Sequence, residues 1–166
     1  MKSNAENDQT KCKVYRIASV LFVTVLASFG CSKRPEPVGL ADWPAVILVT
    51  EDMLTRGDTT SLISHTDISG MPSDKLKNVE EVLQSWHGVP KHLKLDKVEI
   101  IDPKDFKYHE DMSEQMARAF GTPKWSRPPE TIIVYRYSGT DGVKVRYDFG
   151  VFQDCGKWYF SACYPE

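Results

Sequence analysis

Five side chains stand out as possible general acids or bases: Asp148, His65, His87, His92 and His109. Asp148 alternates with Lys144 and Arg146 along an expected strand, so these three share its polar face. A carboxylate becomes an effective base at neutral pH where burial raises its pKa. We expect Asp148 to form an exposed ion pair instead, which contributes little to stability, and we assign no catalytic residue.

Two histidine groups have spacings that resemble metal sites. His87 and His92 flank Gly88 and Pro90, whereas paired zinc ligands on a helix are usually four residues apart. The tripeptide His109-Glu110-Asp111 is explained better as a loop followed by a helix cap. Motifs of serine hydrolases, phosphate-binding loops, thiol redox sites and zinc proteases do not occur. We expect no metal and no cofactor, and the sequence favours a non-enzymatic role without settling it.

Aromatic residues are concentrated in the second half of the chain: Trp125, Tyr135, Tyr137, Tyr147, Trp158 and Tyr159. Aromatic rings with polar tips suit a ligand cavity or a protein contact. The alternative is a sheet core with tyrosines at its edges. The candidate ligand-binding residues are Tyr135, Tyr137, Tyr147 and Trp158.

The N-terminus combines basic residues with an uncharged apolar run, Ile17–Gly30, that ends at Cys31. The run is shorter than the ~20 residues of a membrane span and fits a signal peptide. Ala27–Cys31 resembles a bacterial lipobox, in which Gly30 precedes the cleavage site and Cys31 carries the lipid. We therefore expect a signal peptide over residues 1–30. Cleavage by an ordinary signal peptidase and an uncleaved signal anchor are the alternatives.

This interpretation places the mature protein in the bacterial cell envelope, attached to a membrane through lipid on Cys31 and facing the periplasm or the exterior. Residues 31–40 would be the lipid-attachment cysteine and a tether, and residues 41–166 a single domain. Of the 21 basic and 23 acidic residues of the chain, 17 and 21 remain after residue 30. The mature part is mildly acidic, so we expect no nucleic-acid partner.

Two cysteines remain in the expected domain, Cys155 and Cys163. If one strand connects them, they lie about 26 Å apart. A disulfide needs Cα atoms within ~7 Å. We therefore expect two separate small side chains.

Three helices are expected in the first half of the domain. Asp42 caps the first, and Gly57 ends it. Asp58 caps a short second helix, and Ser73 caps a third that ends before Gly88. Helical spacing gives this third helix an apolar stripe for the core: Leu76, Val79, Val82, Leu83 and Trp86.

The second half is expected to be mainly β. Strands are expected over residues 93–101, 131–137, 143–151 and 158–164, with a short helix over residues 111–120 between the first two. The alternation over residues 143–151 indicates a sheet that is covered on one side. Gly150 in mid-strand suggests a bulge or a sharp bend.

The fold class is therefore α+β, with N-terminal helices packed on a strongly bent antiparallel sheet. The long helix, Gly57-Asp58, the short helix and the final hairpin around Gly156-Lys157-Trp158-Tyr159 resemble the NTF2-like (cystatin-like) family. The resemblance covers about Ala41 to Pro165, and it implies a cone-shaped domain that often encloses a cavity between helices and sheet.

The expected function is a non-catalytic, membrane-anchored envelope lipoprotein whose domain binds a small apolar ligand or an envelope protein. One alternative is an NTF2-like enzyme with a cavity Asp or His as general acid or base. A cystatin-like inhibitor is disfavoured, because its hairpin tips should be apolar, whereas residues 138–142 and 154–157 are polar.

Overall fold

The computed structural model describes residues 36–108, 110 and 123–165. All of them from Pro37 on belong to one compact unit. The expected signal peptide, Cys31 and the expected helix over residues 111–120 lie outside the described residues. Among the residues described, no helix has both the length and the apolar character needed to cross a membrane.

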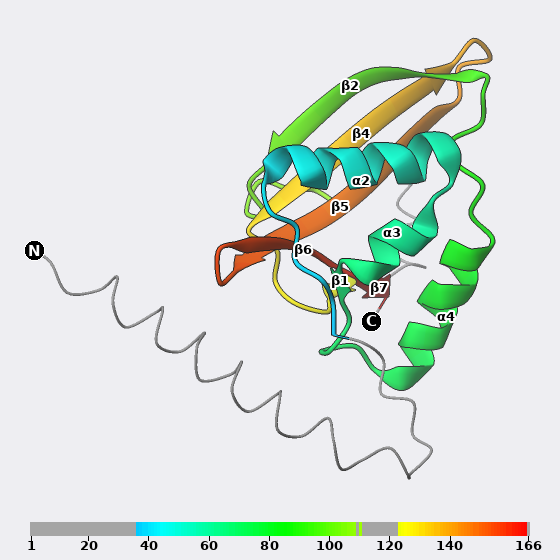
Figure 1. Ribbon diagram of the computed structural model, residues 1–166. Helices are drawn as coiled ribbons and strands as arrows, with labels where there is room; N and C mark the ends of the chain where they lie inside the picture. Colours follow the sequence, from blue (N-terminus) through cyan, green and yellow to red (C-terminus); the bar gives the residue numbers. More distant parts are fainter. Residues whose placement is uncertain (1–35, 109, 111–122, 166) are drawn as a thin grey trace, which may run out of the picture. The chain divides into compact units, whose positions relative to one another are not determined.

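The first helix, α2 (Trp43–Arg56), begins and ends where the sequence predicts (Figure 1). The Asp42 carboxylate accepts a hydrogen bond of 3.0 Å from the backbone amide of Ala45. Gly57 ends the helix in the left-handed conformation, at φ 73°, which a residue without Cβ adopts easily. Asp58 caps α3 (Thr59–Ser64) in the same way as Asp42 caps α2.

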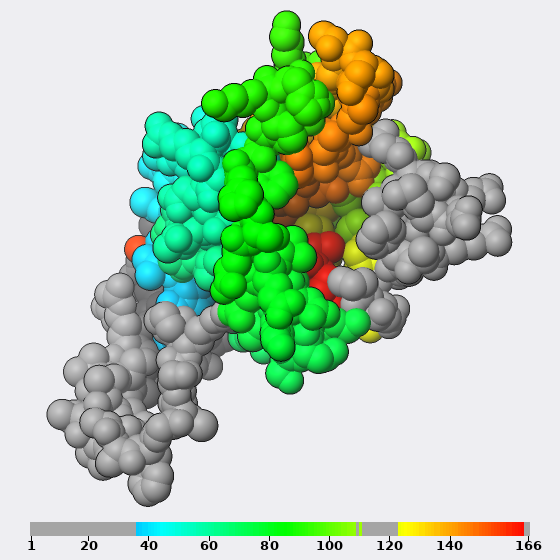
Figure 2. All heavy atoms as spheres, turned by 90° about the vertical axis from the view of Figure 1, so that its right-hand side faces the viewer, coloured from blue at the N-terminus to red at the C-terminus, as the bar shows by residue number. Residues whose placement is uncertain are grey.

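The third helix, α4 (Ser73–Gln84), is less deeply packed than the sequence predicts. Pro72 is its N-cap and no side chain caps it, so the expected cap at Ser73 is wrong. Leu83 packs against the core, but Val82 is 66% exposed and no residue of α4 is buried. Figure 2 shows α4 as a surface layer of green atoms.

The main sheet has the strand order β1-β6-β5-β4-β2. Its strands are β1 (Thr66–Asp67), β2 (Leu93–Ile101), β4 (Thr131–Gly139), β5 (Lys144–Asp154) and β6 (Lys157–Ser161). All neighbours are antiparallel except β1, which runs parallel to β6. The α+β class is confirmed, but the sheet is mixed where an antiparallel one was expected.

A second sheet pairs β3 (Pro123–Trp125) with β7 (Cys163–Pro165). The expected last strand over residues 158–164 is therefore two strands, interrupted at Ala162. β6 completes the main sheet, whereas β7 pairs with β3. This change of sheet brings residues 123–125 beside the end of the chain.

The main core lies between the helices and one face of the main sheet, across which α2 runs (Figure 1). Its buried sheet residues come from alternate positions of neighbouring strands: Ile133, Tyr135, Tyr137, Phe149, Val151 and Phe160. The helices contribute mainly Val46, Val49, Met53, Leu54 and Leu62. Within this core the Thr50 and Tyr135 hydroxyls form a hydrogen bond of 2.7 Å.

The opposite face of the main sheet, here called the outer face, is also covered, so the expectation of a one-sided sheet is wrong. Ile132, Val134 and Phe152 on this face are at most 2% exposed. The charged side chains of Arg146 and Asp148 are only 11% and 23% exposed. A second layer therefore lies over the polar side of β5.

Candidate functional site

The centre of the outer face is a tryptophan lying on a glycine. A Cβ added to Gly150 would lie 2.6 Å from Cζ3 of Trp125, well inside the ~3.5–4.0 Å of a normal carbon contact. The register of β5 is regular on both sides of Gly150, so the expected bulge there is wrong. The register shift lies in β2, between Leu95 and Lys97. Gly150 instead lets an indole ring approach the sheet backbone.

Beside Trp125 is an open pocket of about 370 Å³. Its lining is Pro103, Tyr108, Lys124, Trp125, Pro128, Pro129 and Ile132. Apart from the Tyr108 hydroxyl, the Lys124 ammonium and the Trp125 indole N–H, these side chains are apolar. The volume lies within the ~300–1,000 Å³ typical of small-molecule sites. The pocket therefore suits an apolar body with one polar or anionic group.

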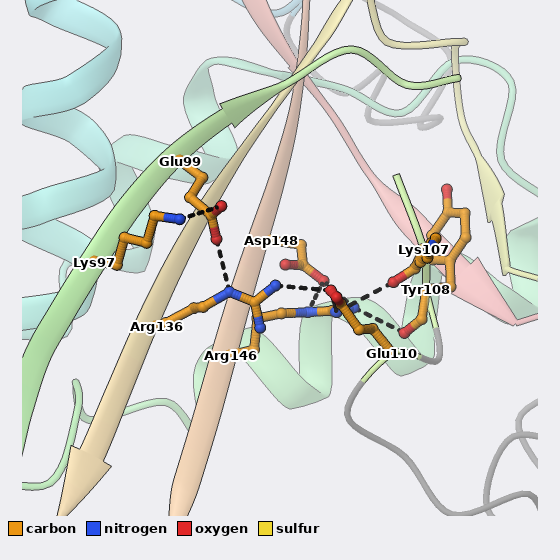
Figure 3. A network of polar contacts seen from close by, with 8 residues as sticks. All are labelled: Lys97, Glu99, Lys107, Tyr108, Glu110, Arg136, Arg146 and Asp148. Carbon is orange, nitrogen blue, oxygen red and sulfur yellow. Dashed lines mark hydrogen bonds and ion pairs between the residues drawn. The ribbon is translucent and has the colours of Figure 1, made fainter. Parts of the chain in front are cut away.

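Arg146 fixes one wall of this pocket. Its guanidinium donates hydrogen bonds to the carbonyl oxygens of Lys107 at 3.1 Å and Tyr108 at 2.7 Å (Figure 3). It also donates to the Asp148 carboxylate at 3.1 Å and lies over the Phe106 ring, 5.2 Å from its centroid. One side chain of β5 thus holds the segment that presents Tyr108.

A second arginine extends the network across three strands. Arg136 of β4 donates from Nε to Glu99 of β2 at 2.7 Å and from Nη2 to Glu110 at 2.9 Å (Figure 3). Lys97 donates to the other carboxylate oxygen of Glu99 at 2.8 Å. These hydrogen bonds, first that from Lys97 and then that from Arg136, lower the pKa of Glu99. The lowered pKa favours the ionised form of Glu99, and the network braces the wall of the pocket.

Tyr108 has a strongly perturbed pKa. Burial raises its pKa to about 12, although a hydrogen bond with Trp125 acts in the opposite direction. Its ring lies 4.7 Å from Phe106 and 6.1 Å from Trp125, measured between centroids. The hydroxyl is therefore neutral at physiological pH, where it can donate or accept a hydrogen bond but is a poor base.

The predicted ligand-binding residues lie elsewhere. Tyr135 and Tyr137 are buried in the main core, at 1% and 9% exposure. Tyr147 packs edge-on against Trp86. Trp158 packs edge-on against Trp43. None of the four lines the pocket, and their role as ligand contacts stays a prediction.

The pocket residues could be found only partly from the sequence. Trp125 was among the aromatic residues noted there. Pro128-Pro129 signalled only the absence of a central strand. Tyr108 carried no local signal, because its environment depends on Arg146, 38 residues away.

The remaining candidates for chemistry are scattered. His87 and His92 are exposed, and His65 contacts the carbonyl of Val38 through Nδ1. The described residues contain no group of three acidic, histidine or cysteine side chains arranged for a metal. His109 and Asp111 lie outside them.

Asp148 is paired with Arg146, as expected, but in a half-buried environment rather than an exposed one. Cys163 is a free thiol. It therefore forms no disulfide with Cys155, as the strand geometry predicts. Cys155 is itself disulfide-bonded, so the expectation of two separate small side chains is wrong for Cys155.

Comparison of the chain with family models, with curated proteins and with solved structures gives no match. The functional argument therefore depends on the site itself.

Proposed function

We propose that this chain is a bacterial envelope lipoprotein whose NTF2-like domain binds a small apolar ligand without transforming it. The observation that carries the binding role is the pocket beside Trp125, with its apolar lining and its volume of about 370 Å³. The lipobox-like residues Ala27–Cys31 and the apolar run before them support the envelope location.

The composition of the pocket favours binding over catalysis. General acid–base catalysis needs a group with a pKa near the working pH, held within hydrogen-bond reach of the substrate. Among the lining residues described, the titratable side chains are Tyr108 and Lys124, and no carboxylate or imidazole is present. The pKa of Tyr108 is about 12. An enzyme with a cavity Asp or His is therefore the less supported alternative.

The ligand class follows from the lining. Trp125 and the flanking prolines offer flat apolar surfaces to a planar or aliphatic body. Lys124 and Tyr108 both line this pocket, and their ammonium and hydroxyl groups would orient a single anionic or polar group. The best candidate is a small amphiphile with one acidic group.

Fluorine NMR with 5-fluorotryptophan tests the binding site in the full chain. The chain has four tryptophans, so each supplies one assignable signal. We expect sodium 1-naphthalenesulfonate, an aromatic anion, to shift the Trp125 signal saturably. Trp43, which packs against Trp158, is the internal control and should keep its signal.

The variant Tyr108→Ala removes one wall of the pocket and should weaken the response of Trp125. An unchanged Trp125 signal, or an equal shift of all four signals, would contradict the binding site. The membrane anchor is tested separately, by intact-mass analysis of wild type and Cys31→Ser. The anchor predicts a mature species beginning at Cys31 with added acyl mass, which the substitution abolishes.

A further inference from the structure

The strand β2 is an edge of the main sheet that carries exposed apolar side chains. Among the described strands it pairs with β4 on one side and with no strand on the other (Figure 1). Leu95, Val98 and Ile100 are 50%, 43% and 60% exposed. Soluble proteins usually protect such edges with charged residues or a bulge, because an unpaired edge is a template for another strand. β2 has both, with Lys97 and the register shift between Leu95 and Lys97, yet these apolar side chains remain exposed. This edge therefore has the properties of a docking surface.

The charges along the edge identify its occupant. Lys97 and Glu99 follow each other on the outer face of β2, with Val98 between them on the helix side. In an antiparallel pair of identical strands related by a two-fold axis, residues on the same face lie opposite each other. An axis at Lys97 or at Glu99 would place like charges opposite. An axis at Val98 places Lys97 of each copy opposite Glu99 of the other.

We infer that β2 pairs antiparallel with β2 of a second copy of this chain, about a two-fold axis at Val98. The pairing joins the two main sheets and covers the exposed Val98 with its own counterpart. Two symmetric Lys97–Glu99 contacts then fix the register. Glu99 remains a hydrogen-bond acceptor of Arg136, which uses the other carboxylate oxygen. This inference is independent of the ligand proposed for the pocket.

Cysteine cross-linking tests the pairing in the full chain, within the membrane fraction of its host. Opposed residues of an antiparallel pair have Cα atoms about 4.5–5.5 Å apart, which suits a disulfide. We expect Val98→Cys to give a disulfide-linked homodimer after oxidation with copper phenanthroline, resolved on a non-reducing gel. Val143→Cys is the matched control, because Val143 is 45% exposed but lies directly before β5. The wild-type chain measures the background from the native cysteines.

A charge reversal tests the register. In the Val98→Cys chain, Lys97→Glu places like charges opposite each other twice, and we expect the cross-linking rate to fall at least about tenfold. Lys91→Glu, an equal charge change before β2, should leave the rate unchanged. Cross-linking at residue 98 no faster than at residue 143, or only to a different protein, would overturn the homodimer. A rate that Lys97→Glu does not change would overturn the Val98 register.

Discussion

Replacing Gly150 by alanine tests the close approach that shapes the pocket. The new Cβ would lie 2.6 Å from Cζ3 and 2.9 Å from both Cε3 and Cη2 of the Trp125 ring. To restore a normal carbon contact, the indole must move by about 1 Å. The φ of Gly150 is not positive, so its backbone conformation accepts alanine. Any loss of stability therefore comes from the contact of the new methyl group with the indole.

Two opposing contributions set the size of the effect. Overpacking of this kind costs about 1–3 kcal/mol. Alanine in place of a strand glycine otherwise contributes about 0.5–1 kcal/mol in favour of folding. We expect Gly150→Ala to lower the free energy of unfolding by about 1 kcal/mol, the difference between the centres of the two ranges.

The sign of the effect should reverse when the indole is absent. In a Trp125→Ala chain, Gly150→Ala meets no ring and should stabilise by about 0.5–1 kcal/mol. Urea unfolding of the wild type, the two single variants and the double variant measures the effect of Gly150→Ala in both backgrounds. The midpoints give the changes in free energy, provided that the m-values agree. Equal destabilisation in both backgrounds, or stabilisation of the wild type, would refute the contact as the reason for this glycine.

Two further predictions concern the wall that Tyr108 forms. Arg146→Lys removes the hydrogen bonds to the carbonyls of Lys107 and Tyr108, each worth about 1 kcal/mol. Hydrogen exchange of the amides at Lys107 and Tyr108 should therefore accelerate about tenfold or more. The control variant Arg127→Lys should leave the exchange of these two amides unchanged. The raised pKa of Tyr108 means that the folded state keeps a proton that the unfolded state loses near pH 10. Its contribution to stability is therefore complete below pH 10 and disappears as the pH rises to about 12. Urea midpoints over this range should fall less in Tyr108→Phe than in the wild type, and equal slopes would show that Tyr108 does not titrate as inferred.

The helix boundaries were predictable from sequence because their causes are local. Asp42 and Asp58 accept hydrogen bonds from amides two or three residues further along, and Gly57 supplies a left-handed residue directly after α2. The cap of α4 failed for an equally local reason. The helix already begins at Ser73, so Pro72 occupies the cap position and provides no side-chain acceptor.

The pocket was not predictable in the same way, because its walls come from distant parts of the chain. Pro103 follows β2, Trp125 lies in β3 and Ile132 lies in β4. Gly150 suggested a bulge or a sharp bend, because a glycine within a strand can mark a bulge, a bend or a close approach of another group. Only the position of Trp125 decides between them.

The covered outer face shows why alternation alone misleads in this protein. Arg146 and Asp148 are charged, and charged residues on alternate positions normally mark a face that contacts water. Burial of such groups is tolerated where each finds hydrogen-bond partners. Arg146 finds its partners in Asp148 and in the carbonyls of the segment that covers it. The side chains that alternation assigns to a solvent-exposed face thus hold the covering layer in place, and the pocket depends on these charges as well as on its aromatic lining.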